Sequence, residues 1–152
     1  MDALDYKILS ILKENARKKA SDISKEIHLS VSTVIERIRK LESSGLIKSY
    51  TIITDEQKMG NHLTALIEIC FSSASGSDSF TEEIMTNPNI ISCCCLTGDF
   101  DFLIKVSCKS SEHLESIYRW LKDLKGVRST RTHVVLRDIK NIYSSLPYPE
   151  EE

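Results

Sequence analysis

The chain has 152 residues and a mass of 17.2 kDa, 41% of its residues are hydrophobic, and its formal net charge is −2 at pH 7. Domains typically hold about 100–150 residues, so this length fits one domain or two small ones and excludes a large multidomain enzyme. No run approaches the roughly 18 apolar residues of a membrane span, and the N-terminus lacks the pattern of a signal peptide. We therefore expect a folded, cytoplasmic protein with no membrane partner.

Charge is divided unevenly along the chain. Residues 1–50 hold ten Lys and Arg against seven Asp and Glu, a net charge of +3, whereas residues 51–152 carry a net charge of −5. A basic first part is compatible with nucleic-acid binding, but an ordinary solvated surface can look the same. The residue pattern has to decide between the two.

Three helices are predicted in the first 45 residues, because apolar residues recur there at helical spacing. The first is capped by Asp2 and ends near residue 15, the second starts at residues 21–22 and breaks at 28–29, and the third runs from its cap Ser30 to Gly45. The β-branched run at residues 46–53 predicts a strand, and residues 55–60 form a polar link.

The second half of the chain predicts a β-α-β-β-α-β order. Period-two strands are expected at residues 63–71, 90–97, 100–108 and 127–138, with a loop at 72–79, a short helix ending before Pro88, a tight reversal at Gly98-Asp99, and a helix from residue 110 or 111 to Gly126. This order is the ferredoxin-like plan, in which both helices cover one face of a four-stranded antiparallel sheet.

Several of these strands are apolar on both faces, as Leu66 and Leu103 show. A sheet with one face in water should not have this pattern. We infer that the second face packs against another copy of the chain about a two-fold axis.

The second and third helices have the lengths and spacing of a helix-turn-helix, although any small three-helix bundle contains such a pair. The outward face of the third helix favours the first interpretation, because it carries hydrogen-bonding and cationic side chains, which suit a DNA major groove: Ser32, Thr33, Glu36, Arg39, Lys40 and Ser43. We expect Arg39, Lys40 and, beside the helix, Lys48 to contact phosphates, and Ser32, Thr33 and Glu36 to contact bases. Arg37 lies on the flank, where it forms either a phosphate clamp or a salt bridge within the domain.

The five cysteines are an odd number in a reducing compartment, so we interpret them as thiols. Cys93, Cys94 and Cys95 are consecutive, and only Cys93 and Cys95 share a side of a strand. No CxxC or histidine spacing completes a zinc set, so we expect no cofactor. The run favours small buried hydrophobic residues, while a redox or metal role stays open if dimerisation brings two such strands together.

These patterns together resemble the Lrp/AsnC family of transcriptional regulators over nearly the full chain. The matching residues are Leu4-Asp5, Ile8-Leu9, Ala16-Arg17, Leu29-Ser30, Val34, Arg37-Ile38, Leu41-Glu42, Gly45-Leu46-Ile47, Tyr50, Gly60, Gly98-Asp99-Phe100-Asp101, Gly126-Val127, Thr132 and Val134-Val135-Leu136. The chain departs from the family at the cysteine run and at Ser24, where the family usually has Ala; a serine fits by bonding back to the chain.

The resemblance implies an α+β chain: a winged helix-turn-helix at residues 1–50, a linker at 51–61, a ferredoxin-like ligand-sensing domain at 62–140 and a tail at 141–152. It implies a regulator of transcription that binds double-stranded DNA through the helix capped by Ser30 and forms dimers that often assemble into octamers. It also implies an amino-acid effector, which we carry over to Gly98, Asp99, Phe100, Asp101 and Thr132. A hairpin turn that uses Gly and Asp only for its geometry is the alternative.

Two other functions remain in play beside this non-catalytic regulator. Decarboxylases that act on sirohaem-type tetrapyrroles resemble the same family, and Arg128, Arg131 and His133 on the last strand have groups that such substrates need. A nucleoid-organising protein that binds DNA by its shape is the other alternative.

Overall fold

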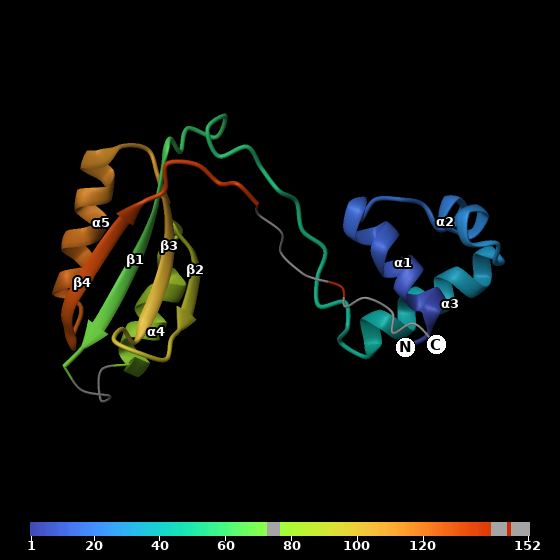
Figure 1. The fold of residues 1–152 in the computed structure, drawn as a ribbon, viewed down its shortest axis with the longest axis horizontal. Coiled ribbons are helices and arrows are strands. Elements are labelled where there is room, and N and C mark those ends of the chain that lie inside the picture. Colours follow the sequence, from blue (N-terminus) through green and yellow to red (C-terminus); the bar gives the residue numbers. More distant parts are fainter. Residues whose placement is uncertain (73–76, 141–145, 147–152) are drawn as a thin grey trace. The chain divides into compact units, whose positions relative to one another are not determined.

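The computed structural model describes residues 1–72, 77–140 and 146. The chain forms two compact units, unit 1 with Met1–Ile53 and unit 2 with Thr54–Lys140 (Figure 1). The predicted tail at 141–152 lies outside the described residues, apart from Leu146. Within the described ranges, no helix is long and apolar enough to cross a membrane.

Unit 1 consists of the three predicted helices, α1 (Ala3–Glu14), α2 (Ala20–Ile27) and α3 (Val31–Ser43). Each helix turns its apolar stripe toward the other two, since burying such stripes is what stabilises short amphipathic helices. The buried side chains are Ile8, Leu12, Ile23, Ile27, Val34 and Leu41. Helical spacing predicts Val31 on the apolar face of α3 with Val34, Ile38 and Leu41, but Val31 keeps 43% of its surface exposed.

The predicted helix ends are largely confirmed. Asp2 caps α1 in a capping box with Asp5, and Ser30 caps α3. His28 (φ 56°) and Gly45 (φ 76°) have the left-handed conformation that ends a helix. The start of α2 was predicted one residue late: Lys19 is its N-cap, without a side-chain hydrogen bond, and Asp22 lies in the first turn, where its charge suits the helix dipole.

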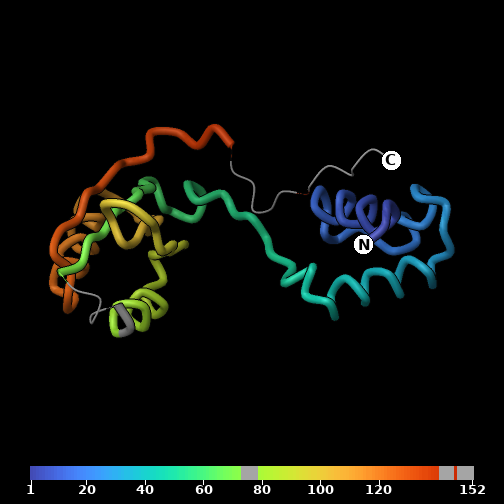
Figure 2. Tube along the Cα trace, turned by 60° about the horizontal axis from the view of Figure 1, so that its bottom comes forward, coloured from blue at the N-terminus to red at the C-terminus, as the bar shows by residue number. Residues whose placement is uncertain are grey.

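The predicted strand at residues 46–53 is wrong. These residues have no strand conformation, and Figure 2 shows them leaving α3 as an open trace. Ile52 and Ile53 are 81% and 71% exposed. A strand needs a hydrogen-bonded neighbour, and the described part of unit 1 supplies none. The β-branched sequence therefore has the propensity for a strand but no partner within the chain.

Unit 2 has the predicted β-α-β-β-α-β order. Its elements are β1 (Leu63–Phe71), α4 (Ser77–Thr86), β2 (Ile90–Cys95), β3 (Phe102–Cys108), α5 (Ser111–Asp123) and β4 (Val127–Val134). The strands form an antiparallel sheet in the order β2-β3-β1-β4. The ferredoxin-like plan is confirmed.

Both helices of unit 2 cover the same face of the sheet. Phe80 and Ile84 of α4 and Ile117 and Leu121 of α5 pack on the strand residues Ala65, Ile67, Ile69, Ile104 and Val106, all of them buried. Phe71, Phe80 and Phe102 lie edge to face or tilted, with ring centroids 4.9–5.6 Å apart. We call this covered side of the sheet the helix face and the opposite side the open face.

Several predicted boundaries in unit 2 are wrong. Helix α4 begins at Ser77, inside the predicted loop 72–79, because Ser and Asp also suit the first turn of a helix. The turn between β2 and β3 spans residues 96–101 instead of a two-residue reversal at Gly98-Asp99. Strand β4 ends at Val134 and not near residue 138. The Val135 amide still donates to the Thr64 carbonyl, but β1 begins at Leu63, so residues of the chain beyond Val135 have no partner strand to pair with.

Cys93, Cys94 and Cys95 are exposed in the chain, so the prediction that they are buried hydrophobic residues is wrong for the single chain. They lie on β2, which is an edge strand. The two buried cysteines are Cys70 and Cys108. Ser24, the other departure from the family pattern, behaves as expected, because its hydroxyl donates to the Ser21 carbonyl at 2.9 Å.

The helix face accounts for much of the stability of unit 2. We expect Ile104→Ala to lower the free energy of unfolding of unit 2 by about 2–5 kcal/mol, because a fully buried side chain leaves a cavity. Met85→Ala on α4, where the side chain is 82% exposed, is the matched control and should change it by less than about 0.5 kcal/mol. Urea denaturation followed by circular dichroism measures both; equal losses would contradict this assignment of the core.

Candidate nucleic-acid interface

Helix α3 begins with a cluster of hydroxyl groups. Ser30 accepts a hydrogen bond from the Thr33 amide at 3.1 Å, and its Oγ shares hydrogen bonds with the hydroxyls of Ser32 (2.9 Å) and Thr33 (2.7 Å). Ser30 and Ser32 are exposed, and Thr33 is half-buried. The helix therefore presents hydroxyls and the positive end of its dipole at one place, which is a suitable site for an anion.

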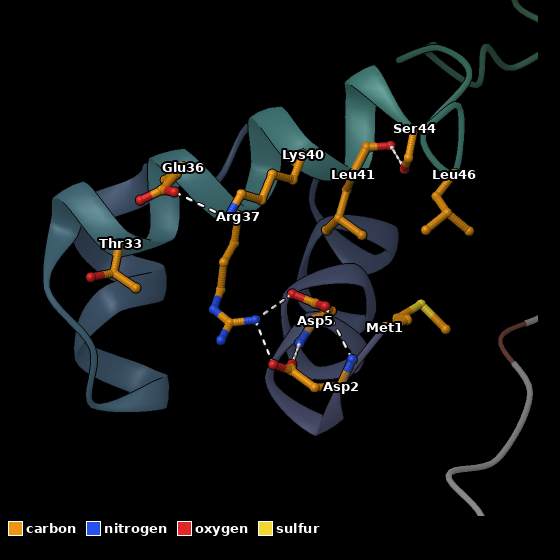
Figure 3. A pocket seen from close by; sticks show the side chains of 10 residues that line it. All are labelled: Met1, Asp2, Asp5, Thr33, Glu36, Arg37, Lys40, Leu41, Ser44 and Leu46. Atoms are coloured by element: carbon orange, nitrogen blue, oxygen red, sulfur yellow. Dashed lines mark hydrogen bonds and ion pairs between the residues drawn. The ribbon is translucent and has the colours of Figure 1, made fainter.

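The predicted outward face of α3 is exposed over its next turns. Glu36, Arg39, Lys40 and Ser43 are all exposed, and so is Lys48 beyond the helix. Lys40 Nζ lies 3.1 Å from Glu36 Oε1, an exposed pair that contributes little to stability (Figure 3). Arg39 and Lys48 make no ion pair with any described residue, so their charges are available to a ligand.

Arg37 lies on the flank of α3 and points toward the start of α1 (Figure 3). Its Nη1 donates to Asp2 Oδ2 at 2.8 Å and to Asp5 Oδ1 at 2.7 Å. The other oxygens of these carboxylates form the capping box: Asp2 Oδ1 accepts from the amides of Leu4 and Asp5, and Asp5 Oδ2 accepts from the amide of Asp2. One guanidinium thus joins the third helix to the cap of the first.

The charges of this bridge stabilise one another. The hydrogen bond from the Asp5 amide, followed by that from Arg37, lowers the pKa of Asp2, and the two carboxylates raise the pKa of Arg37. Of the two roles predicted for Arg37, the structure therefore has the salt bridge within the domain. The sequence did not single out Asp2 and Asp5 as its partners, because helix capping already explained both residues.

An open groove runs along this bridge between α1 and α3 (Figure 3). It is lined by Met1, Asp2, Asp5, Thr33, Glu36, Arg37, Lys40, Leu41, Ser44 and Leu46. Sequence reasoning also missed two exposed apolar side chains on α3, Val31 and Ile35, with 43% and 38% of their surface exposed. The sequence did contain a signal for Ile35, because its position along the helix places it outside the apolar stripe and so predicts an exposed side chain.

The residues predicted for an effector come only partly together. The turn between β2 and β3 contains Gly98, Asp99, Phe100 and Asp101. Thr132 lies on β4, where it pairs with Ile67 of β1, and β4 is two strands away from β3 in the sheet. Thr132 thus belongs to the helix face, at the edge of the sheet. The turn reaches β4 through Phe100 instead, whose ring centroid lies 4.9 Å from the Arg131 guanidinium carbon.

The two aspartates of this turn differ in their surroundings. Asp101 fixes the turn to the end of β1: its Oδ2 accepts from the Phe71 amide at 2.6 Å and its own amide donates to the Ile69 carbonyl at 2.9 Å. Asp99 makes no hydrogen bond or ion pair with any described residue and is exposed. Of these two aspartates, Asp99 is therefore the one whose carboxylate has neither oxygen engaged by a described residue.

The basic residues of the last strand are also engaged within the chain. Arg131 and His133 approach Glu68 Oε2 at 3.7 and 3.4 Å on the open face, and Arg128 Nη2 lies 2.8 Å from the Cys70 sulfur. No group of three or more His, Cys, Asp or Glu that could hold a metal ion occurs in the described part of the chain.

Comparison with known proteins identifies both units. The family model of the winged helix-turn-helix DNA-binding domain matches residues 1–48, and that of the Lrp/AsnC ligand binding domain matches residues 64–144. The chain belongs to the Lrp/AsnC family of transcriptional regulators. Among its relatives, the HTH-type transcriptional regulator FL11 of Pyrococcus horikoshii is 34% identical over 92% of each chain. LrpB of Bacillus subtilis is 32% identical over 95% of each chain.

Solved structures of Lrp/AsnC proteins are similar over nearly the whole chain. A transcriptional regulator of Neisseria meningitidis in complex with L-methionine matches with a TM-score of 0.91 and 27% identity, covering 97% of this chain and 96% of that one. LrpC of Bacillus subtilis matches with a TM-score of 0.82 and 31% identity, covering 92% and 97%. The predicted family, fold class and type of function, a transcriptional regulator, are confirmed. The relatives described here are named as regulators and not as decarboxylases.

The bridge predicts how two arginines of α3 differ in DNA binding. A cation that contacts a phosphate contributes about one unit to the slope of log affinity against log salt concentration. We expect Arg39→Met to make this slope shallower by about 1, and Arg37→Met to leave it unchanged while it lowers the Tm of unit 1. Fluorescence anisotropy with duplex DNA and thermal scans measure the two effects; an equal change of slope in both variants would show that Arg37 contacts DNA.

Proposed function

We propose that this Lrp/AsnC regulator works in the cytoplasm and binds double-stranded DNA with the outward face of α3 in a major groove. The observation that carries the proposal is the division of the cations on this helix. Arg37 is bound by two carboxylates, whereas Arg39 is exposed and free of internal partners. A phosphate-binding surface needs a helix that is held in place and cations that are free to contact the phosphates. Arg37 meets the first need and Arg39 meets the second.

Each exposed residue of α3 has a role in this proposal. Arg39, Lys40 and Lys48 bind phosphates, and the hydroxyls of Ser30, Ser32 and Thr33 meet the DNA where the helix begins, with Ser32 and Thr33 reaching base edges. Glu36 accepts a hydrogen bond from a cytosine amino group, for which it exchanges its surface pair with Lys40. Val31 and Ile35 offer apolar contacts to thymine methyl groups.

DNA from upstream of the protein's own gene provides the test. Fluorescence anisotropy should show a preference of about 10³-fold or more for this DNA over a scrambled duplex. Glu36→Ala should reduce the preference at one base pair by about 1–3 kcal/mol, whereas Glu42→Ala, on the same helix, should not. Equal and cooperative binding to both duplexes would favour a nucleoid-organising protein, and binding to neither would favour an enzyme on the same fold.

We propose that the open face of the sheet is the dimer interface. The helices of unit 2 leave this face uncovered, and it carries Leu66 and Leu103 beside Glu68 and Arg131. Apolar side chains interrupted by a few paired charges are typical of a contact between subunits. The unpaired segment at residues 46–53 supports a dimer further, because a second copy would supply the neighbouring strand that one chain lacks. Assembly of dimers into octamers is what the family resemblance implies.

Sedimentation measures the dimer directly. We expect the chain to be a dimer or a larger assembly at micromolar concentration, and Leu103→Asp to shift it to monomers, because a carboxylate on the open face would have to be buried without a partner. Met85→Asp, on the helix side of unit 2, is the control and should leave the assembly intact. A stable monomer of the unmodified chain would contradict the proposal.

We propose that the turn at residues 98–101 contributes to the site for an amino-acid effector. The free carboxylate of Asp99 suits the ammonium group of an amino acid, and the turn amides suit its carboxylate. A structural relative is solved in complex with L-methionine, which supports this class of ligand. Asp101 serves the turn itself, and Thr132 joins the site only if a second chain brings another strand edge to it.

The effector response should therefore depend on the carboxylate of Asp99. A mixture of amino acids should change the DNA affinity of the unmodified chain if it contains the effector. Asp99→Asn should then raise the effector concentration needed for this change at least tenfold, because the ammonium group of the effector loses its counter-charge. Asp123→Asn, an exposed aspartate at the end of α5, should respond like the unmodified chain. An unaltered response in Asp99→Asn would leave the turn with a purely geometrical role.

A further inference from the structure

The cysteine run at Cys93, Cys94 and Cys95 forms part of neither the DNA surface nor the effector turn. It occupies the last three positions of β2, which is one edge of the sheet (Figure 1). All three thiols are exposed, in contrast to the buried Cys70 and Cys108. Burial as small hydrophobic side chains therefore does not explain three adjacent cysteines in this chain.

Pairing with β3 assigns each thiol to a face of the sheet. Cys93 pairs with Ile104 and Cys95 with Phe102, which are both part of the core under the helices. Cys94 pairs with Leu103 and so belongs to the open face. Cys93 and Cys95 are thus neighbours on the helix face, at its edge, and a dimer formed through the open face would leave them in place.

Strand geometry prevents these thiols from forming a disulfide with each other. A disulfide needs β-carbons about 3.5–4.5 Å apart. Adjacent strand residues point to opposite faces, and alternate residues are separated by two steps of about 3.3 Å, which gives roughly 6.6 Å. Cys93 and Cys95 therefore stay side by side as two thiols as long as β2 keeps its strand conformation.

We propose that Cys93 and Cys95 form a two-sulfur site for a soft monovalent cation, Cu(I). Metal–sulfur bonds are about 2.3 Å long, so an ion between two thiolates needs sulfurs about 4.6 Å apart, which side chains with β-carbons roughly 6.6 Å apart reach by leaning toward each other. Binding releases one proton from each thiol and leaves the oxidation state of copper and sulfur unchanged.

The ligand set selects the type of ion. Soft thiolates favour Cu(I) and zinc among the metals of cells, but zinc requires four ligands in a tetrahedron. The described residues offer no group of three or more metal-binding side chains here, whereas two thiolates in line complete the coordination of Cu(I). Cys94, on the other side of the strand, is not a ligand.

Titration of the full chain with Cu(I) under anaerobic conditions tests the site, with bicinchoninate as a coloured competitor for the ion. We expect the unmodified chain to withdraw about one Cu(I) per chain, and Cys93→Ser and Cys95→Ser each to weaken binding at least tenfold. Cys94→Ser is the matched control and should bind like the unmodified chain. Circular dichroism establishes that each variant is folded, and DNA anisotropy of the same variants reports separately on the proposed function.

Three outcomes would overturn this proposal. The first is that the unmodified chain withdraws no copper from the competitor. The second is that Cys93→Ser and Cys95→Ser bind as tightly as Cys94→Ser. The third is a stoichiometry of about half an ion per chain that is lost in Cys94→Ser, which would place copper between two chains on the open face.

Discussion

One guanidinium joins the third helix, for which we propose contact with DNA, to the cap of the first helix. Arg37 reaches from α3 to both carboxylates of the capping box at the start of α1, at 2.7 and 2.8 Å. Burial of the apolar stripe of α3 against the other two helices turns its polar side outward. The guanidinium between two carboxylates adds a directional contact, which joins α3 to the start of α1.

This constraint explains the distribution of charge on α3. The cation nearest the core is neutralised by acids of the same unit, and the cations farther out stay free or form only surface pairs. The net charge of the whole chain conceals this arrangement, because unit 2 is acidic. Unit 2 in turn uses one face of its sheet for its own core and leaves the other to a second copy in our proposal.

Much of the fold could be predicted from local sequence. Asp2, Ser30 and Gly45 mark helix ends because capping depends on the residue and its nearest neighbours along the chain. The order of unit 2 follows from periodicity in the same way. The segment at residues 46–53 could not be predicted, because strand formation depends on a neighbour that the single chain does not contain.

The candidate site was predictable only where residue type alone decides the chemistry. The exposed hydroxyls and cations of α3 follow from its helical period. The partners of Arg37 lie more than 30 residues away in the sequence, and the Phe71 amide that donates to Asp101 belongs to a different strand, so both assignments required the fold. The difference between Asp99 and Asp101 has the same origin, since both residues belong to one short turn.

Hydrogen exchange of the full chain with and without DNA from upstream of its own gene tests the central claim most directly. If the outward face of α3 enters the major groove, peptides that cover Val31–Ser43 and Lys48 should exchange more slowly when DNA is bound, and peptides from α1 should change little. Slower exchange confined to unit 2, with α3 unaffected, would contradict the account.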